Sequence, residues 1–159
     1  MKLVVIGGGP GGYVAALKAA MLGAEVTIVE KGKVGGTCLN VGCIPTKALL
    51  ACSDILNTVK EAKKYGIQIE GDIKADFTTI IERKEKVITQ LVKGIEFLFE
   101  SKGVKLVRGL GKLVSNKEVE VTKEDGTKES IQADKIILAT GSVPVVPKFL
   151  PYDGKNVMT

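Results

Sequence analysis

Two short apolar runs separated by a helix-forming stretch open the chain. The run KLVVI (2–6) is followed by glycines, and AEVTIVE (24–30) is rich in β-branched residues, so both are typical of buried strands. Between them, GYVAALKAAML (12–22) consists largely of helix formers and is followed by Gly23, a suitable helix C-cap. A strand, a helix and a strand in this order predict two parallel strands joined by a right-handed crossover.

Two longer amphipathic helices are predicted downstream. The first begins near Pro45, and its apolar residues recur at spacings of three and four: Ala48, Leu49, Cys52, Ile55, Leu56, Val59 and Ala62. The second is expected to begin at the capping residue Asp76 and to end at Gly103. Its apolar stripe consists of Ile80, Ile81, Val87, Ile88, Leu91, Ile95, Leu98 and Phe99. We expect both stripes, with the Cys52 thiol, to be buried.

The last third of the chain has the pattern of strands and turns. The segments VKLVRGLGKLV (104–114), KEVEVTK (117–123) and ESIQADKIILAT (129–140) alternate or run apolar, and EDGTK forms a turn between the last two. They predict an antiparallel meander followed by a final buried strand, KIILAT. The proline-rich tail that follows has the composition of a linker. The expected fold class is α/β, with a parallel sheet, helices and an antiparallel β-meander insertion.

Composition and charge narrow the function classes. The 159 residues carry a net charge of +5, but the lysines are scattered among glutamates on predicted solvated helix faces, and no cluster of basic and aromatic residues is present. We therefore expect no nucleic-acid partner. The first apolar run is too short for an export signal, and no stretch approaches 18 apolar residues, so we expect no membrane span and a cytoplasmic protein.

The glycines after the first predicted strand fit the pattern G-x-G-x-x-G. In this context Gly7 permits a tight turn, Gly9 allows the backbone to approach a pyrophosphate, and Gly12 allows the helix to pack close to the strand. Glu30 ends the second strand, where an acid can accept hydrogen bonds from an adenosine ribose. The loop alone fits FAD and NAD equally, and a plain turn beside an exposed glutamate is the simpler alternative.

The stretch GGTCLNVGCIPTK (35–47) holds two cysteines five positions apart. A structural zinc site needs four ligands, whereas the chain has three cysteines and no histidine. In a regular helix Cα atoms five residues apart lie roughly 9 Å from each other, too far for a disulfide. A bridge would therefore require the backbone to leave helical geometry near Gly42. A disulfide formed under such a constraint should be readily reduced, which suits a redox-active pair better than an inert structural crosslink. Two free thiols remain the alternative.

This stretch resembles, over its whole length, the redox-active disulfide signature of the pyridine nucleotide-disulfide oxidoreductases, the family of dihydrolipoamide dehydrogenase, glutathione reductase and mercuric reductase. The segments GGGPGGYVAALKAAMLG, VEKG, LVKGIEFLFESKGVKLVRGLGKL and IILATGSVP look most like the dihydrolipoamide dehydrogenases of that family. The resemblance implies a Rossmann-like FAD-binding domain over residues 1–143, followed by a linker over residues 144–159 that leads toward an NAD-binding domain.

The resemblance also implies the site. Cys38 would exchange with a dithiol substrate, and Cys43 would contact the flavin. FAD would be bound by Gly7, Gly8, Gly9, Pro10, Gly11, Gly12, Glu30, Lys31, Gly36, Thr37, Cys38, Cys43, Lys47, Gly111, Thr140, Gly141 and Ser142. NAD would be the final electron acceptor, the substrate would be a lipoyl-bearing protein or a small dithiol, and the parent enzyme would be a homodimer. No metal ligands are expected.

Members of that family are longer and use a histidine base from a later domain, whereas this sequence contains no histidine. We therefore interpret the chain as the N-terminal FAD-domain segment of a dihydrolipoamide dehydrogenase, not competent for full turnover by itself. A segment of a glutathione or mercuric reductase, or a non-catalytic FAD-binding module, is the alternative.

Overall fold

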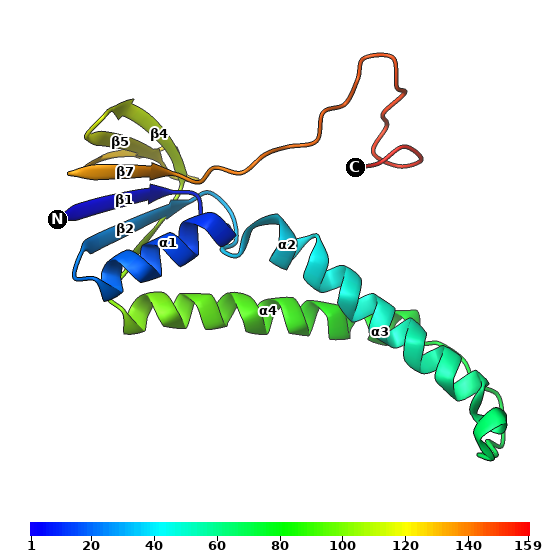
Figure 1. Ribbon diagram of the computed structural model, residues 1–159. Coiled ribbons are helices and arrows are strands. Elements are labelled where there is room, and N and C mark those ends of the chain that lie inside the picture. Colours follow the sequence, from blue (N-terminus) through cyan, green and yellow to red (C-terminus); the bar gives the residue numbers. More distant parts are fainter.

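A computed structural model describes residues 1–159 and contains a four-stranded parallel sheet (Figure 1). Its strands are β1 (Lys2–Ile6), β2 (Glu25–Glu30), β3 (Lys105–Arg108) and β7 (Lys135–Leu138), in the order β3-β2-β1-β7. β1 and β2 pair in parallel from Lys2–Glu25 to Ile6–Val29. The predicted strand–helix–strand unit is therefore confirmed, and β7 adds a second parallel neighbour to β1.

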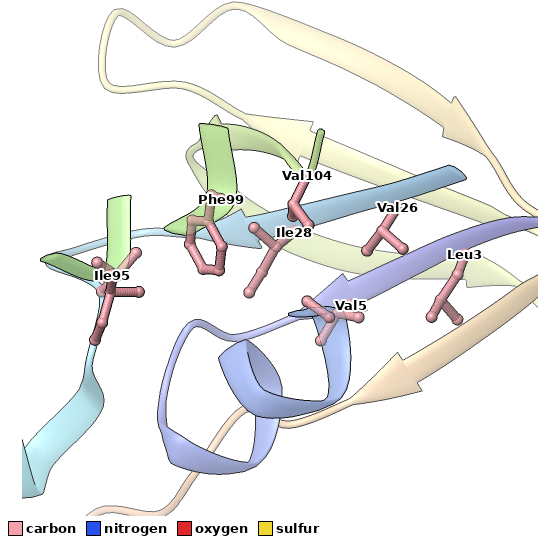
Figure 2. Close-up of a cluster of buried hydrophobic side chains, with 9 residues drawn as sticks. Leu3, Val5, Val26, Ile28, Ile95, Phe99 and Val104 are labelled. Atoms are coloured by element: carbon pink, nitrogen blue, oxygen red, sulfur yellow. The ribbon is translucent and has the colours of Figure 1, made fainter. Parts of the chain in front are cut away.

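One face of the sheet is covered by α1 (Pro10–Met21) and α4 (Phe77–Ser101) (Figure 1). The helix α1 ends at the predicted place, because Gly23 takes the left-handed conformation, with φ +85°. Figure 2 shows the apolar cluster that this packing buries. It contains Leu3, Val5, Ala16, Val26, Ile28, Val34, Ile95, Phe99 and Val104.

The opposite face of the sheet packs against an antiparallel meander of β4 (Leu110–Ser115), β5 (Glu118–Thr122) and β6 (Lys128–Gln132) (Figure 1). Val119 and Val121 of β5 are fully buried against Val4, Ile6 and Val29 of the parallel sheet, among others. The predicted meander is thus confirmed, and it forms the second layer of the core.

Two predicted segments, 104–114 and 129–140, prove to cross from one sheet to the other. The first divides into β3 and β4 at Gly109, whose φ is +154°. A β-carbon at Gly109 would lie 2.6 Å from Val121 Cγ1 and 2.7 Å from the Thr122 oxygen, so only glycine fits this crossing. The expectation that KIILAT is a buried strand is wrong. β7 is an edge strand, and Leu138 is 59% exposed.

A helical hairpin extends away from the sheet (Figure 1). It consists of α2 (Gly36–Asn40), α3 (Cys43–Lys60), the short 3₁₀ helix η1 (Ala62–Tyr65) and the first half of α4. Asp76 caps α4 as predicted, since its Oδ1 accepts hydrogen bonds from the Thr78 and Thr79 nitrogens at 3.0 and 3.3 Å. Gly103, with φ +68°, follows the C-terminus of α4, also as predicted.

The apolar stripes of the hairpin are less buried than expected. Ile55 of α3 is 63% exposed, because along the hairpin α3 has only α4 to pack against, and one neighbouring helix covers only part of a wide apolar stripe. Leu91 and Leu98, in the half of α4 that lies along the sheet, are 41% and 42% exposed, because that half turns Ile95 and Phe99 toward the core instead. Cys52 is accordingly half-buried and not buried.

Two further features lie outside the sheet. By length and mean hydropathy (1.3), the stretch Gly36–Lys60 meets the description of a membrane-crossing helix, whereas we expected no membrane span from the sequence. This stretch is interrupted between α2 and α3, and its α3 part packs along α4. Residues 141–159 contain no helix or strand and run away from the sheet (Figure 1).

Candidate functional site

The loop between β1 and α1 packs against β2 and against the residue that follows β7. Gly7 has φ +106°, and its N–H donates to the Val29 oxygen of β2 at 2.8 Å. A β-carbon at Gly7 would overlap the Ala139 carbonyl after β7, and one at Gly12 would overlap the Gly7 carbonyl. The turn and the close helix–strand approach therefore have the geometry expected for Gly7 and Gly12.

The same loop leaves hydrogen-bond donors free at the N-terminus of α1. The N–H groups of Gly9, Gly11 and Gly12 donate to no acceptor in the protein, and Pro10, at the first helical position, has no N–H to satisfy. Gly9 has room, because its nearest neighbour beyond the adjacent residues would lie 3.7 Å from an added β-carbon. Free donors at the positive end of a 12-residue helix form a site that fits a phosphate group.

Glu30 is held beside this loop by hydrogen bonds to both carboxylate oxygens. Its Oε2 accepts from the Gly8 N–H at 2.6 Å, and its Oε1 accepts from the Gly32 N–H at 2.7 Å. Each oxygen keeps a further lone pair that a ribose hydroxyl could use. Lys31, the next residue along the chain, is exposed.

Sequence reasoning missed Arg108, which supports the Glu30 turn. Its guanidinium, at the end of β3, donates to the Gly32 carbonyl and pairs with Glu96 of α4. The three groups come from distant parts of the sequence, and no motif marks any of them. Parallel pairing of Glu30 with Arg108 in β2 and β3 is the signal that could have pointed to this contact.

Two more predicted segments meet the glycine loop at the ends of the strands. The Ala139 N–H donates to the Ile6 oxygen at 2.8 Å, so Thr140, Gly141 and Ser142 continue from a point in contact with Gly7. Gly111 of β4 lies over the ends of β1 and β2, where an added β-carbon would be 3.0 Å from Ile6 Cγ2 and 3.1 Å from Val29 Cγ1. From β1 the chain continues to β2 and β3 on one side of the sheet, whereas β7 is added on the other side, so the switch in strand order lies between β1 and β7. Open α/β sheets bind ligands at the carboxyl ends of the strands beside such a switch point.

The cysteine segment begins directly on the glycine loop. The Gly35 N–H donates to the Gly8 oxygen at 2.8 Å. A β-carbon on Gly36 would lie 2.8 Å from Gly9 Cα and 3.0 Å from Pro10 Cδ. Helix α2 therefore starts in contact with the residues that offer the free donors.

Cys38 and Cys43 form a disulfide with their Cα atoms 4.7 Å apart. As predicted, the backbone leaves helical geometry between them, since α2 ends at Asn40 and α3 begins at Cys43. The role of Gly42 is close packing, because a β-carbon there would lie 3.1 Å from the Thr37 oxygen and 3.2 Å from Cys38 Cα. In the structure these two cysteines are therefore bridged, and Cys52 is the free one.

The remaining predicted residues surround this disulfide. Cys43 is exposed at the first position of the 18-residue α3, Cys38 is half-buried, and Thr37 and Lys47 are exposed. Lys47 follows Cys43 by four residues and so lies on the same face of α3. Cys52 is free, and its thiol lies 3.4 Å from the Ala48 oxygen, two turns beyond the bridge.

Asn40 provides the one unsatisfied buried side-chain atom. Its Nδ2 donates to the Val34 and Gly36 carbonyls, both at 3.0 Å, whereas its buried Oδ1 has no hydrogen-bond partner. An orphaned acceptor costs free energy unless a donor reaches it. This oxygen and the free N–H groups of the glycine loop together fit a ligand that carries both phosphates and hydroxyl groups.

Comparison with known proteins finds that the chain is similar to several dihydrolipoyl dehydrogenases. The chain is 41% identical over 159 residues to the dihydrolipoyl dehydrogenase of Bacillus subtilis (99% of this chain, 34% of the relative), and 45% identical over 146 residues to that of Acholeplasma laidlawii (92% and 42%). It is 49% identical over 142 residues to the mitochondrial dihydrolipoyl dehydrogenase of Dictyostelium discoideum (88% and 29%). The chain thus spans about a third of the length of these curated relatives. Residues 1–159 match the family model described as pyridine nucleotide-disulphide oxidoreductase, and the chain belongs to this family.

Proposed function

We propose that this chain binds FAD and carries the redox-active disulfide of a dihydrolipoyl dehydrogenase. The observation that supports this most directly is the contact between the two motifs. The segment that holds Cys38 and Cys43 starts on the dinucleotide loop, through the Gly35–Gly8 hydrogen bond and the packing of Gly36 on Gly9. A dinucleotide bound at this loop would therefore lie beside a dithiol–disulfide couple.

The residues proposed to hold FAD fall into three groups. The glycine loop (7–12) would bind the pyrophosphate through its free N–H groups, and Glu30, with Lys31 beside it, would bind the adenosine ribose. Gly111 and the turn Thr140–Ser142 would close the same edge of the sheet. Gly36, Thr37, Cys38, Cys43 and Lys47 would lie along the part of the cofactor that carries the flavin. FAD, when bound, supplies two-electron redox chemistry between a dithiol and a nicotinamide dinucleotide.

The chain's own part in the reaction is thiol–disulfide exchange. A thiolate of the substrate dithiol attacks Cys38 Sγ, the Cys38–Cys43 bond breaks, and Cys43 leaves as a thiolate. The second substrate thiol then attacks the mixed disulfide, which releases the Cys38 thiol and leaves the substrate as a cyclic disulfide. Two electrons pass to the cysteine pair as the dithiol is oxidised. The N-terminus of α3 favours a thiolate at Cys43, because the positive end of the helix dipole lies there.

The substrate, partners and domain limits of the parent enzyme complete the proposal. The substrate is dihydrolipoamide, free or on a lipoyl-bearing protein, NAD is the final acceptor, and the parent is a homodimer. Support comes from the relatives named above, which are dihydrolipoyl dehydrogenases. Residues 1–143 are proposed to be the first segment of the FAD-binding domain, and residues 144–159 the linker toward an NAD-binding domain.

The purified chain tests both halves of this proposal. FAD binding is measured by quenching of flavin fluorescence, and reduction of the bridge is measured by alkylation and mass spectrometry after anaerobic addition of dihydrolipoamide. We expect saturable FAD binding and reduction of Cys38–Cys43 by dihydrolipoamide at lower concentrations than by glutathione. Preferential reduction by glutathione would assign the chain to another disulfide reductase, and absence of FAD binding would contradict the cofactor.

A further inference from the structure

Asn40 lies between the two bridged cysteines and reaches back to the segment before them. Its Nδ2 donates to the Val34 and Gly36 carbonyls. Val34 is fully buried and outside every helix and strand, and no backbone N–H donates to its carbonyl. The Asn40 amide is therefore the only protein donor that satisfies this buried oxygen.

Asn40 holds Val34 and Gly36, the residues on either side of Gly35, and this short segment contacts the dinucleotide loop. Gly35 donates to the Gly8 oxygen, and Gly36 packs on Gly9 and Pro10. No other side-chain hydrogen bond involves residues 34–43. The Asn40 amide is thus the only side-chain hydrogen-bonding group between the cysteines, and it ties the end of α2 to the residues on either side of Gly35, which itself contacts the loop.

We propose that Asn40 is a positioning residue for the redox disulfide. Its two hydrogen bonds hold α2 in place against the glycine loop, so that the backbone break at Val41–Gly42 presents Cys38 to Cys43 with the Cα atoms 4.7 Å apart. Without the amide, the reduced segment samples more conformations, and the effective concentration of one thiol at the other falls. The equilibrium between disulfide and dithiol then shifts toward the dithiol.

The inference concerns the redox pair of the proposed function, and it is tested without FAD. The native chain, Asn40→Ala and the control Asn57→Ala are equilibrated with mixtures of reduced and oxidised dithiothreitol, alkylated and analysed by mass spectrometry. Asn57 is an exposed asparagine on α3 whose side chain makes no hydrogen bond within the protein. We expect Asn40→Ala to shift the equilibrium constant about fivefold toward the dithiol, or about 20 mV for this two-electron couple. Asn57→Ala should stay within about twofold of native.

A second variant separates positioning from general destabilisation. Asn40→Asp keeps the size of the side chain but turns a second oxygen toward the two carbonyls, and only its protonated form can donate to one of them. Its shift relative to native should therefore be larger at about pH 8 than at about pH 6, where more of a buried carboxyl is protonated. A native equilibrium constant in folded Asn40→Ala, or a pH-independent shift in Asn40→Asp, would overturn the proposal. Reduction of the native bridge and FAD binding are scored separately and test the proposed function by themselves.

Discussion

The Gly7 carbonyl oxygen lies against Gly12 Cα so closely that a β-carbon at Gly12 would overlap it. This contact joins the turn after β1 to the first turn of α1, and thereby sets the position of the free N–H groups between them. Gly9, in the same loop, has no such contact, since an added β-carbon would lie 3.7 Å from its nearest neighbour. Two glycines of one motif therefore have separable roles, one in the fold and one toward the ligand.

Gly12→Ala is expected to destabilise the chain by roughly 1–3 kcal/mol, because the helix must shift to accommodate the added carbon. Gly9→Ala should leave stability nearly unchanged and weaken FAD binding, since the methyl group stands where the backbone approaches the pyrophosphate. Stability is measured by denaturant unfolding and affinity by flavin quenching. Gly94→Ala on the exposed side of α4 is the control and should be stabilising by about 0.5–1 kcal/mol. Equal effects of Gly9→Ala and Gly12→Ala on stability would contradict this division.

The second prediction concerns the three cysteines. Alkylation under non-reducing conditions should modify Cys52 alone, and partial reduction should release Cys38 and Cys43 together, because only these two residues are bridged. Peptide mapping by mass spectrometry distinguishes the three sites. Cys52→Ser should leave the redox equilibrium of the pair native, whereas detection of a bridge to Cys52 would refute the pairing.

Much of the fold could be predicted from local pattern, and the site only in part. The β1–α1–β2 unit, the Asp76 cap and the meander depend on neighbouring residues, so periodicity and capping chemistry were sufficient to find them. The crossing at Gly109 could not be read in this way, because the reason for glycine there is contact with Val121 and Thr122 on another strand. The exposure of Leu138 and Ile55 likewise depends on which neighbours are present, which an apolar pattern does not record.

The third prediction is a pH dependence centred on Asp134. Its carboxylate accepts a hydrogen bond from the Lys2 N–H at 2.7 Å, and this bond, aided by nearby positive charges, lowers the pKa of Asp134. A lowered pKa in the folded state means that the stabilisation is fully present above the unfolded pKa of about 4 and is lost as pH falls through the folded value. Thermal unfolding between about pH 5 and pH 2.5 should therefore show a smaller loss of stability in Asp134→Asn than in the native chain. Asp54→Asn, which removes a carboxylate that accepts no hydrogen bond in the protein, should retain the native acid dependence.

Arg108 provides a fourth prediction, because it holds the Gly32 carbonyl while Gly32 holds Glu30. Arg108→Ala should weaken binding of ADP, which carries the adenosine and pyrophosphate parts of FAD, by a few-fold. Stability should change little, because the ion pair with Glu96 is partly open to solvent, with side chains 47% and 34% exposed. Arg108→Lys should restore only part of the affinity, since an ammonium cannot span the carbonyl and the carboxylate as a guanidinium does. Titration calorimetry measures both, and Lys105→Ala, on the same strand, is the control. Native ADP affinity in Arg108→Ala would show that the turn needs no such support.

The last prediction concerns turnover by the 159 residues alone. Oxidation of a dithiol by NAD requires a nicotinamide site, and it is normally assisted by a base that takes a proton from the attacking thiol. The chain contains one G-x-G-x-x-G loop, already proposed to bind FAD, and no histidine. It also covers only about a third of the length of the relatives named above. We therefore expect negligible NADH formation from dihydrolipoamide and NAD with FAD in excess, although the Cys38–Cys43 bridge is still reduced once per chain. Steady NADH formation by the homogeneous chain, abolished by Cys38→Ser, would show that these residues contain a hydride acceptor site beyond those described.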